Sequence, residues 1–186
     1  YAFTNSSEAT LFNGVGLPAS SFRTDNWDII TEKAVLKPYL DPETKILSYQ
    51  LSTQAREADI YYDFNKVPDK NSNRYLLPVP AGKTGILYAT VSRNGYLAET
   101  FSKWKISANK AKGAAITYQS TFSEKYGAGN ELALQDGVLA SDNYRDGAWQ
   151  GFEGNNLQVI IDMGKTQDVK SIRCNFLSDN NAGIFL

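Results

Sequence analysis

The residue types best suited to chemistry in this chain lie in its second half, around Trp149. Asn143-Tyr144-Arg145-Asp146 precedes this tryptophan and Phe152-Glu153 follows it, in a stretch rich in turn-forming residues. An aromatic face can stack on the apolar face of a sugar ring, while amide and planar guanidinium groups supply directed hydrogen bonds. This pattern points to sugar recognition, with Tyr144, Arg145, Trp149 and Phe152 as the candidate carbohydrate-binding residues.

Catalysis is expected to be absent, because the 186 residues contain no histidine. The chain therefore has no Ser-His-Asp or Cys-His site of its own, and it lacks the His and Cys sets that hold zinc. A fragment that kept esterase or glycosidase activity would need a different base. Paired carboxylates such as Asp142 with Asp146, or Glu153 with Asp162, could serve on a glycosidic bond, but they read as solvated loop acids.

The charge and hydropathy of the chain argue against some classes of partner. Nineteen basic and 20 acidic residues give a net charge of -1 with no basic stripe, which argues against nucleic acid. No run of about 18 apolar residues is present, so no membrane span is expected. The one cysteine, Cys174, alternates with polar neighbours and is predicted to be a buried structural thiol. Because the sequence opens at Tyr1 without Met and stops in an apolar run at Leu186, we expect a piece of a larger protein, with catalytic residues before Tyr1.

The elements expected to position these residues are β-strands. Period-two alternation runs from about residue 29 to 106, for example over Leu47–Leu51 and Ile60–Phe64. Asp41-Pro42-Glu43-Thr44 is typical of a turn, and Asn94-Gly95 predicts a hairpin between Ile86–Arg93 and Tyr96–Ile106. Several short strands at such spacing predict an immunoglobulin-like β-sandwich.

A polar stretch over 107–113 then leads into a second all-β unit. Alternation over Val159–Met163 and again over Ile172–Phe176 predicts two further strands. The division expected is an extended tail over 1–28, a sandwich over 29–108, and an incomplete β-unit over 109–186. The last unit spans too few residues for a complete sandwich, so about half of it is expected to be missing.

Three stretches resemble known families. Leu11-Phe12-Asn13, Gly16-Leu17-Pro18-Ala19-Ser20 and Phe22-Arg23-Thr24-Asp25 resemble the closing segment of sialate O-acetylesterase-type catalytic domains. That resemblance implies an upstream catalytic domain in the same chain. Phe22–Asp25 would form either part of that esterase's wall or a packing surface between domains.

The middle region resembles the small β-sandwich that follows catalytic domains in bacterial β-hexosaminidases and chitobiases. Ala58-Asp59-Ile60-Tyr61-Tyr62-Asp63 stands where that family has a characteristic strand, and Ile86-Leu87-Tyr88-Ala89 follows in family order. The sequence departs from the family at Phe64-Asn65, where the usual Asp-Gly-Ser turn is missing.

The last 75 or so residues resemble the front half of a discoidin (F5/8 type C) domain, which implies a partial, galactose-binding-like jelly roll. The residues that carry this are Ser123–Tyr126, Ala133–Gly137, Arg145–Phe152 and Leu157–Lys165. In that family the position of Trp149 is usually a core tryptophan, which leaves Tyr144 and Arg145 as the stronger ligand candidates. The resemblance also implies a possible structural calcium ion at Asp136, in the Asp136-Gly137 turn; otherwise this Asp simply starts the turn.

These features together predict the non-catalytic, all-β accessory region of a periplasmic, cell-surface or secreted glycan-processing hydrolase, either sialate O-acetylesterase-like or β-hexosaminidase-like. Its expected partners are the upstream catalytic domain and a sialylated or N-acetylhexosamine-containing glycan. The alternative is a pair of structural spacer domains with no ligand.

Overall fold

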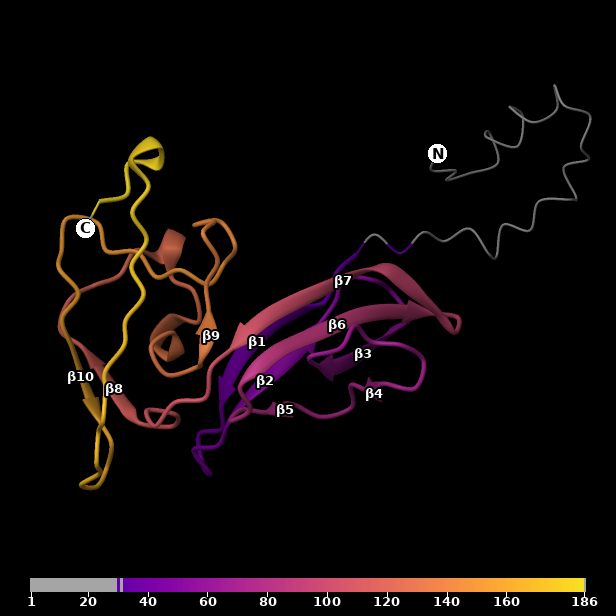
Figure 1. Cartoon of the computed structure of the whole chain (residues 1–186), viewed down its shortest axis with the longest axis horizontal. Coiled ribbons are helices and arrows are strands. Elements are labelled where there is room, and N and C mark those ends of the chain that lie inside the picture. The colour runs from indigo at the N-terminus through magenta and orange to yellow at the C-terminus, as the bar shows by residue number, and fades with distance from the viewer. Residues whose placement is uncertain (1–29, 31, 186) are drawn as a thin grey trace, which may run out of the picture.

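The structure, a computed structural model, describes residue 30 and residues 32–185. The esterase-like segment predicted over 1–28 lies outside the described residues. Within the described part, every regular element is a β-strand or a single turn of 3₁₀ helix, so the prediction of an all-β fold is confirmed (Figure 1).

Two antiparallel sheets pack face to face and form a β-sandwich. The first has the order β1 (Val35–Leu40), β2 (Leu47–Ser52), β5 (Val79–Pro80). The second has the order β4 (Asn73–Arg74), β3 (Ala58–Phe64), β6 (Gly85–Arg93), β7 (Tyr96–Ile106), β9 (Val138–Leu139). Buried side chains from both sheets form one continuous core, so the sandwich has the two-layer architecture that its alternating sequence predicts.

The core follows from the period of two along the strands. Leu47, Tyr49 and Leu51 of β2 are all at most 5% exposed. Tyr49 and Leu51 belong to one core cluster with Leu87, Ala89 and Val91 of β6, which are at most 1% exposed. Side chains two residues apart point to the same face of a strand, so this spacing places an apolar row on the inner side of each sheet. Burial of such rows is the main stabilising contribution to a sandwich of this size.

Local turn chemistry sets the strand register. Asn94 and Gly95 both have positive φ, 52° and 80°, as a type I′ hairpin requires, and Arg93 pairs with Tyr96 across the turn. Before β2, the Asp41 carboxylate accepts hydrogen bonds from the backbone N–H groups of Glu43 and Thr44, at 3.0 and 2.7 Å. Both predicted turns are therefore present.

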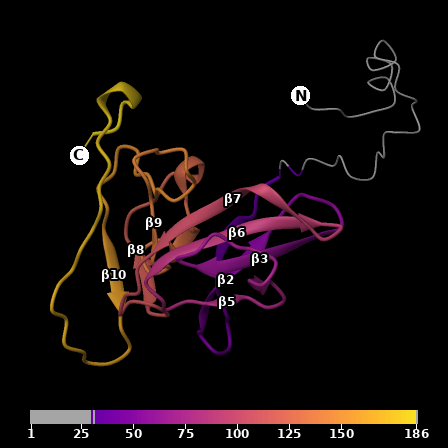
Figure 2. The ribbon, with the colours of Figure 1, turned by 45° about the vertical axis from the view of Figure 1, so that its right-hand side comes forward.

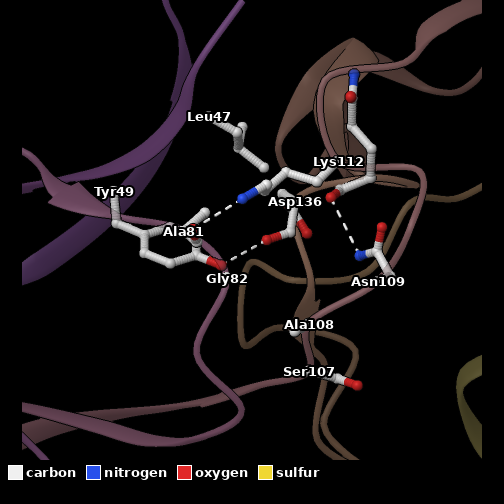
Figure 3. Close-up of a pocket in the computed structure, with 10 residues that line it drawn as sticks. Leu47, Tyr49, Ala81, Gly82, Ser107, Ala108, Asn109, Lys112 and Asp136 are labelled. Carbon is white, nitrogen blue, oxygen red and sulfur yellow. Dashed lines mark hydrogen bonds between the residues drawn. The ribbon is translucent and has the colours of Figure 1, made fainter. Parts of the chain in front are cut away.

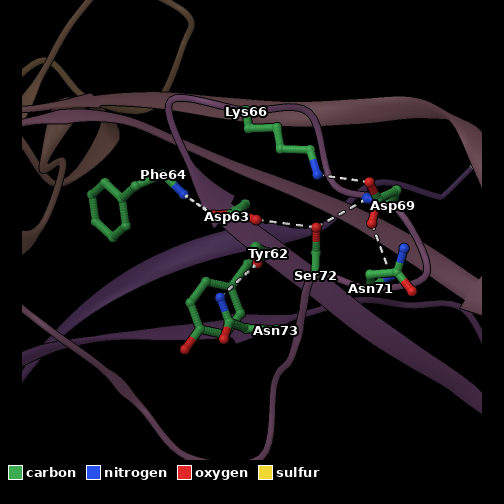
Figure 4. Close-up of polar contacts among 8 residues, drawn as sticks. All are labelled: Tyr62, Asp63, Phe64, Lys66, Asp69, Asn71, Ser72 and Asn73. Carbon is green, nitrogen blue, oxygen red and sulfur yellow. Dashed lines mark hydrogen bonds and ion pairs between the residues drawn. The ribbon is translucent and has the colours of Figure 1, made fainter.

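A polar loop follows β3 at the place where the sequence departs from the hexosaminidase pattern (Figure 4). Ser72 Oγ donates to Asp63 Oδ2 at 3.1 Å and accepts from the backbone N–H of Asp69 at 3.0 Å, and Lys66 pairs with Asp69 at 2.7 Å. Asn65 has φ 61°, and its Oδ1 accepts from the Ile86 N–H at 2.8 Å. The strand continues to Phe64, and side chains of the loop replace the missing turn residues.

The C-terminal part lies at one end of the sandwich (Figures 1 and 2). It contains a two-stranded antiparallel ribbon of β8 (Ala115–Tyr118) and β10 (Val159–Asp162), with three 3₁₀ turns, η4 (Glu124–Tyr126), η5 (Asn130–Leu132) and η6 (Asn180–Ala182). Its short strand β9 pairs with the end of β7, with Lys105 opposite Leu139 and Ile106 opposite Val138. This pairing attaches the C-terminal part to the five-stranded sheet.

Two predictions for the C-terminal segment are wrong. Residues 171–176 form no strand in the described chain, and Ile172 and Phe176 are 90% and 62% exposed. Cys174 is exposed rather than a buried thiol. The physical reason is shared: no described strand pairs with residues 171–176 and all six are exposed, so the alternating apolar side chains have no second layer to bury them.

No helix in the described part of the chain has the length and apolarity needed to cross a bilayer.

Candidate functional site

Two backbone segments form a pocket in the C-terminal part, which we call the 125–149 pocket. Its lining residues are Lys125, Tyr126, Gly127, Ala128, Tyr144, Arg145, Gly147 and Trp149. The volume is about 400 Å³, within the usual range of about 300–1,000 Å³ for small-molecule sites. Three of the four predicted carbohydrate-binding residues, Tyr144, Arg145 and Trp149, therefore line a single cavity.

Backbone pairing brings the two walls of this pocket together. Gly127 forms an antiparallel bridge with Gln150, and the Gly151 N–H donates to the Tyr126 carbonyl at 2.8 Å. The Ser123 N–H in turn donates to the Gly151 carbonyl at 2.8 Å. A residue larger than glycine at 151 would press on Tyr126, whose Cβ would be 3.0 Å from an added Cβ. These contacts fix the distance between the segment carrying Tyr126 and the loop carrying Trp149.

Hydrogen bonds within the loop over 141–149 hold its shape. The Asp146 carboxylate accepts from the backbone N–H and hydroxyl of Ser141, at 2.6 and 2.7 Å, and from the Ala148 N–H at 2.8 Å. Asn143 Oδ1 accepts from the Arg145 N–H at 3.0 Å. Asp146 and Asn143 therefore serve the loop itself, and the side chains left to face a ligand are those of Tyr144, Arg145 and Trp149.

Trp149 is oriented by its own indole N–H, which donates to the Ser141 carbonyl at 2.7 Å. The residue is half-buried and lines the pocket, so it packs against the loop with part of its surface and faces the cavity with the rest. No ring or cation stacks on Trp149 among the described residues. This position allows both packing and ligand contact, so the ligand role of Trp149 stays a prediction.

Two tyrosines and two cations complete the pocket. Tyr126 and Tyr144 meet edge to face, with ring centroids 6.3 Å apart and planes at 69°. Arg145 Cζ lies 5.0 Å from the Tyr144 centroid, and Lys125 Nζ lies 5.0 Å from the Tyr126 centroid. A hydrogen bond with the Tyr126 side chain, helped by the charge of Glu153, raises the pKa of Lys125. Both cations therefore lie against aromatic faces.

Phe152 is the predicted residue that the pocket does not include. It is half-buried and follows Gly151, but it is not among the lining residues. Sequence reasoning in turn missed Lys125 and Tyr126 as site residues. A Lys-Tyr pair beside Gly127 and Gly129 gives no local sign of its role, because its place in the pocket depends on pairing with residues more than 20 positions away.

A second, much smaller cavity surrounds Asp136 at the junction of the sandwich and the C-terminal part (Figure 3). Its volume is about 10 Å³, which matches one water molecule and excludes a sugar. Tyr49 of β2 donates its hydroxyl to the Asp136 carbonyl at 2.7 Å, Asn109 Nδ2 donates to the Gln135 carbonyl at 3.2 Å, and Lys112 Nζ donates to the Ala81 carbonyl at 3.1 Å. The Tyr49 and Lys112 bonds connect the sandwich with the C-terminal part, and the Asn109 bond lies within the C-terminal part.

Burial governs the ionisation of the groups in this junction. Asp136 is 5% exposed, and its Oδ1 accepts from the Val138 N–H at 2.8 Å, in the turn that starts β9. Burial raises the pKa of the Asp136 carboxyl to about 7, because a charged carboxylate loses its hydration there. Burial, with the Asp136 charge as a second cause, raises the pKa of Tyr49 to about 12.

The donor set around Asp136 fits a calcium ion poorly. Asp136 is the only carboxylate lining the cavity, and the Lys112 ammonium group lines the same small space and would repel a cation. Gln135 Oε1 is a buried acceptor without a hydrogen-bond partner in the described chain. Calcium usually takes six to eight oxygen ligands, several of them charged. No group of three or more His, Cys, Asp or Glu gathers elsewhere in the described residues.

Comparison with models of protein families and with curated proteins gives no match to this chain.

Proposed function

We propose that this chain is a non-catalytic accessory region of a glycan-processing hydrolase and that it binds carbohydrate in the 125–149 pocket. The observation that carries the proposal is the convergence of Tyr144, Arg145 and Trp149 on one cavity of about 400 Å³, where Tyr126 joins them. Aromatic surface with a few directed polar groups is the composition expected of a sugar site. In this account the sandwich is a rigid spacer, and the C-terminal part carries the ligand.

Sequence resemblance supports the proposed parent enzyme. The runs at Gly16–Asp25 and Ala58–Asp63 resemble segments of sialate O-acetylesterases and of β-hexosaminidase C-terminal sandwiches. We place the protein accordingly in the periplasm, at the cell surface or outside the cell, with an upstream catalytic domain as its covalent partner. Sugar binding in the pocket would keep the upstream catalytic domain near its glycan substrate.

Replacing Trp149 with Ala is expected to weaken sugar binding by about tenfold or more, since one buried aromatic contact contributes on the order of 1.5 kcal/mol. Isothermal titration of the chain with galactose, N-acetylglucosamine, chitobiose and N-acetylneuraminic acid at millimolar concentration measures this. Trp104, on the sandwich strand β7, offers a matched control. A Trp104→Phe variant is expected to bind as the wild type does.

Flat titrations with all four sugars, on a chain shown to be folded by circular dichroism, would contradict the binding proposal and favour the spacer alternative. Equal loss of binding in Trp149→Ala and Trp104→Phe would place the site elsewhere. Turnover of p-nitrophenyl acetate that rises in proportion to protein concentration would overturn the non-catalytic part of the proposal.

A further inference from the structure

The charged side chains that line the 125–149 pocket are all positive. Its lining contains two cations, Lys125 and Arg145, and no carboxylate. The nearest loop acid in sequence, Asp146, accepts three hydrogen bonds from Ser141 and Ala148, so its charge is directed into the loop. The whole chain has a net charge of -1, whereas the lining of this pocket carries two positive charges, with the Glu153 carboxylate outside the lining but near Lys125.

Both cations are exposed and lie against aromatic rings. Each lies 5.0 Å from the centroid of its tyrosine ring, Lys125 over Tyr126 and Arg145 over Tyr144. The two rings touch edge to face, which places the two cations on neighbouring supports across one cavity. Ordering a long cationic side chain in advance lowers the entropy lost when it binds an anion.

We infer that the 125–149 pocket selects sugars that carry a carboxylate over neutral sugars of the same shape. This inference rests on the proposed function and specifies its ligand class. The guanidinium of Arg145 can form two parallel hydrogen bonds with a carboxylate, and the Lys125 ammonium adds a second charge. Trp149, with its ring oriented by Ser141, supplies the surface on which the sugar ring stacks.

Phosphate or sulfate esters would offer similar charge but a different shape. A planar carboxylate fixed to a pyranose ring places its two oxygens in the plane that matches the guanidinium fork, while the ring itself supplies the apolar face that Trp149 needs. The aromatic lining of Tyr126, Tyr144 and Trp149 therefore favours an acidic sugar over a small free anion.

Two matched ligand pairs test the charge preference. One pair is the methyl glycosides of galacturonic acid and galactose, which differ only at the C6 carboxylate, and the other is N-acetylneuraminic acid and its methyl ester. Isothermal titration of the whole chain in 50 mM salt is expected to show at least about fivefold tighter binding of each acid, with the difference shrinking in 500 mM salt.

Variants of the pocket should change this ratio and leave the fold intact. Arg145→Gln is expected to reduce the acid preference to about twofold or less, and Glu153→Gln, which removes a negative charge near Lys125, to increase acid affinity by up to about twofold. Lys70→Gln removes one positive charge, as Arg145→Gln does, but on an exposed loop of the sandwich. It should leave the preference for acidic sugars unchanged.

The failure of this inference can be told apart from the failure of the proposed function. If neither acid binds better than its neutral partner while binding still depends on Trp149, the charge preference is wrong and the sugar site stands. If no sugar of either pair binds, both are wrong. A preference that Lys70→Gln reduces as much as Arg145→Gln does would reflect net charge alone and would overturn the assignment to the pocket.

Discussion

Replacing Asp136 with Asn is expected to raise the free energy of unfolding at pH 8 by about 4 kcal/mol. The native carboxyl is 5% exposed, and its pKa is raised to about 7, whereas an Asp in the unfolded chain titrates near 3.9. Between these values the unfolded chain binds fewer protons than the native one, so the stability of the wild type falls as pH rises from about 4 to 7 and is flat above. Asn carries no charge, and its Oδ1 can still accept from Val138.

The groups around Asp136 are consistent with a stability that falls as pH rises. Tyr49 donates to the Asp136 carbonyl and not to its carboxylate, and Lys112 lines the cavity while donating to Ala81. Neither offsets the burial of the charge enough to bring the pKa of the Asp136 carboxyl back to its ordinary range. Urea unfolding at pH 4.5, 6 and 8, followed by tryptophan fluorescence, measures the dependence.

Asp162 provides a matched control for this change. Its Oδ1 also accepts from the backbone N–H two residues ahead, that of Gly164, at the same 2.8 Å, but the residue is exposed. Asp162→Asn should therefore leave the pH dependence of unfolding as it is in the wild type. A wild-type stability that does not fall between pH 4.5 and 7, or an Asp136→Asn variant with the wild-type slope, would contradict the assignment.

Replacing Gly137 with Ala is expected to lower the free energy of unfolding by about 3 kcal/mol or more. Gly137 has φ 76°, and a Cβ at this position would lie 2.5 Å from the backbone oxygen of Ser107. Ser107 cannot retreat easily, because its N–H donates to the Gly137 carbonyl at 2.8 Å next to the β7–β9 pairing. Steric overlap with backbone adds to the cost of the left-handed conformation.

Gly164 separates these two contributions. It has a similar φ of 70° but no atom within 4 Å of an added Cβ. Gly164→Ala should therefore cost only about 1 kcal/mol, the conformational part alone. Equal destabilisation by the two substitutions, measured by denaturant unfolding at one pH, would show that the junction does not hold the C-terminal part against the sandwich as tightly as these contacts indicate.

The sandwich was the part of the molecule most readily predicted from sequence. Its signals are local: the alternation over Leu47–Leu51 buries one face, and Asn94-Gly95 fixes the register of β6 against β7. Both depend on residues within one strand or one turn, where periodicity and turn preferences act directly. The β7–β9 pairing has no such signal, because β9 is two residues long and lies more than 30 positions from its partner.

The C-terminal part shows the limit of the same reasoning. Alternation over Ile172–Phe176 predicts a half-buried strand, yet burial needs a second layer that the period alone does not supply. Of the pocket, Tyr144, Arg145 and Trp149 could be found because they are adjacent in sequence and rich in sugar-binding chemistry. Lys125 and Tyr126 could not, since only the Gly127–Gln150 bridge brings them to the loop.

The most direct test of sugar binding at the 125–149 pocket is a ¹⁵N–¹H titration that follows the indole resonances of the tryptophans. The Trp149 Nε1–H is hydrogen-bonded to Ser141 beside the cavity, while Trp104 lies on β7 of the sandwich. Addition of methyl galacturonide or galactoside is expected to shift the Trp149 indole signal and the backbone signals of Tyr126 and Arg145, in a saturable way, and to leave Trp104 unshifted. Saturable shifts confined to the sandwich, or no shift at Trp149 at tens of millimolar sugar, would contradict the account.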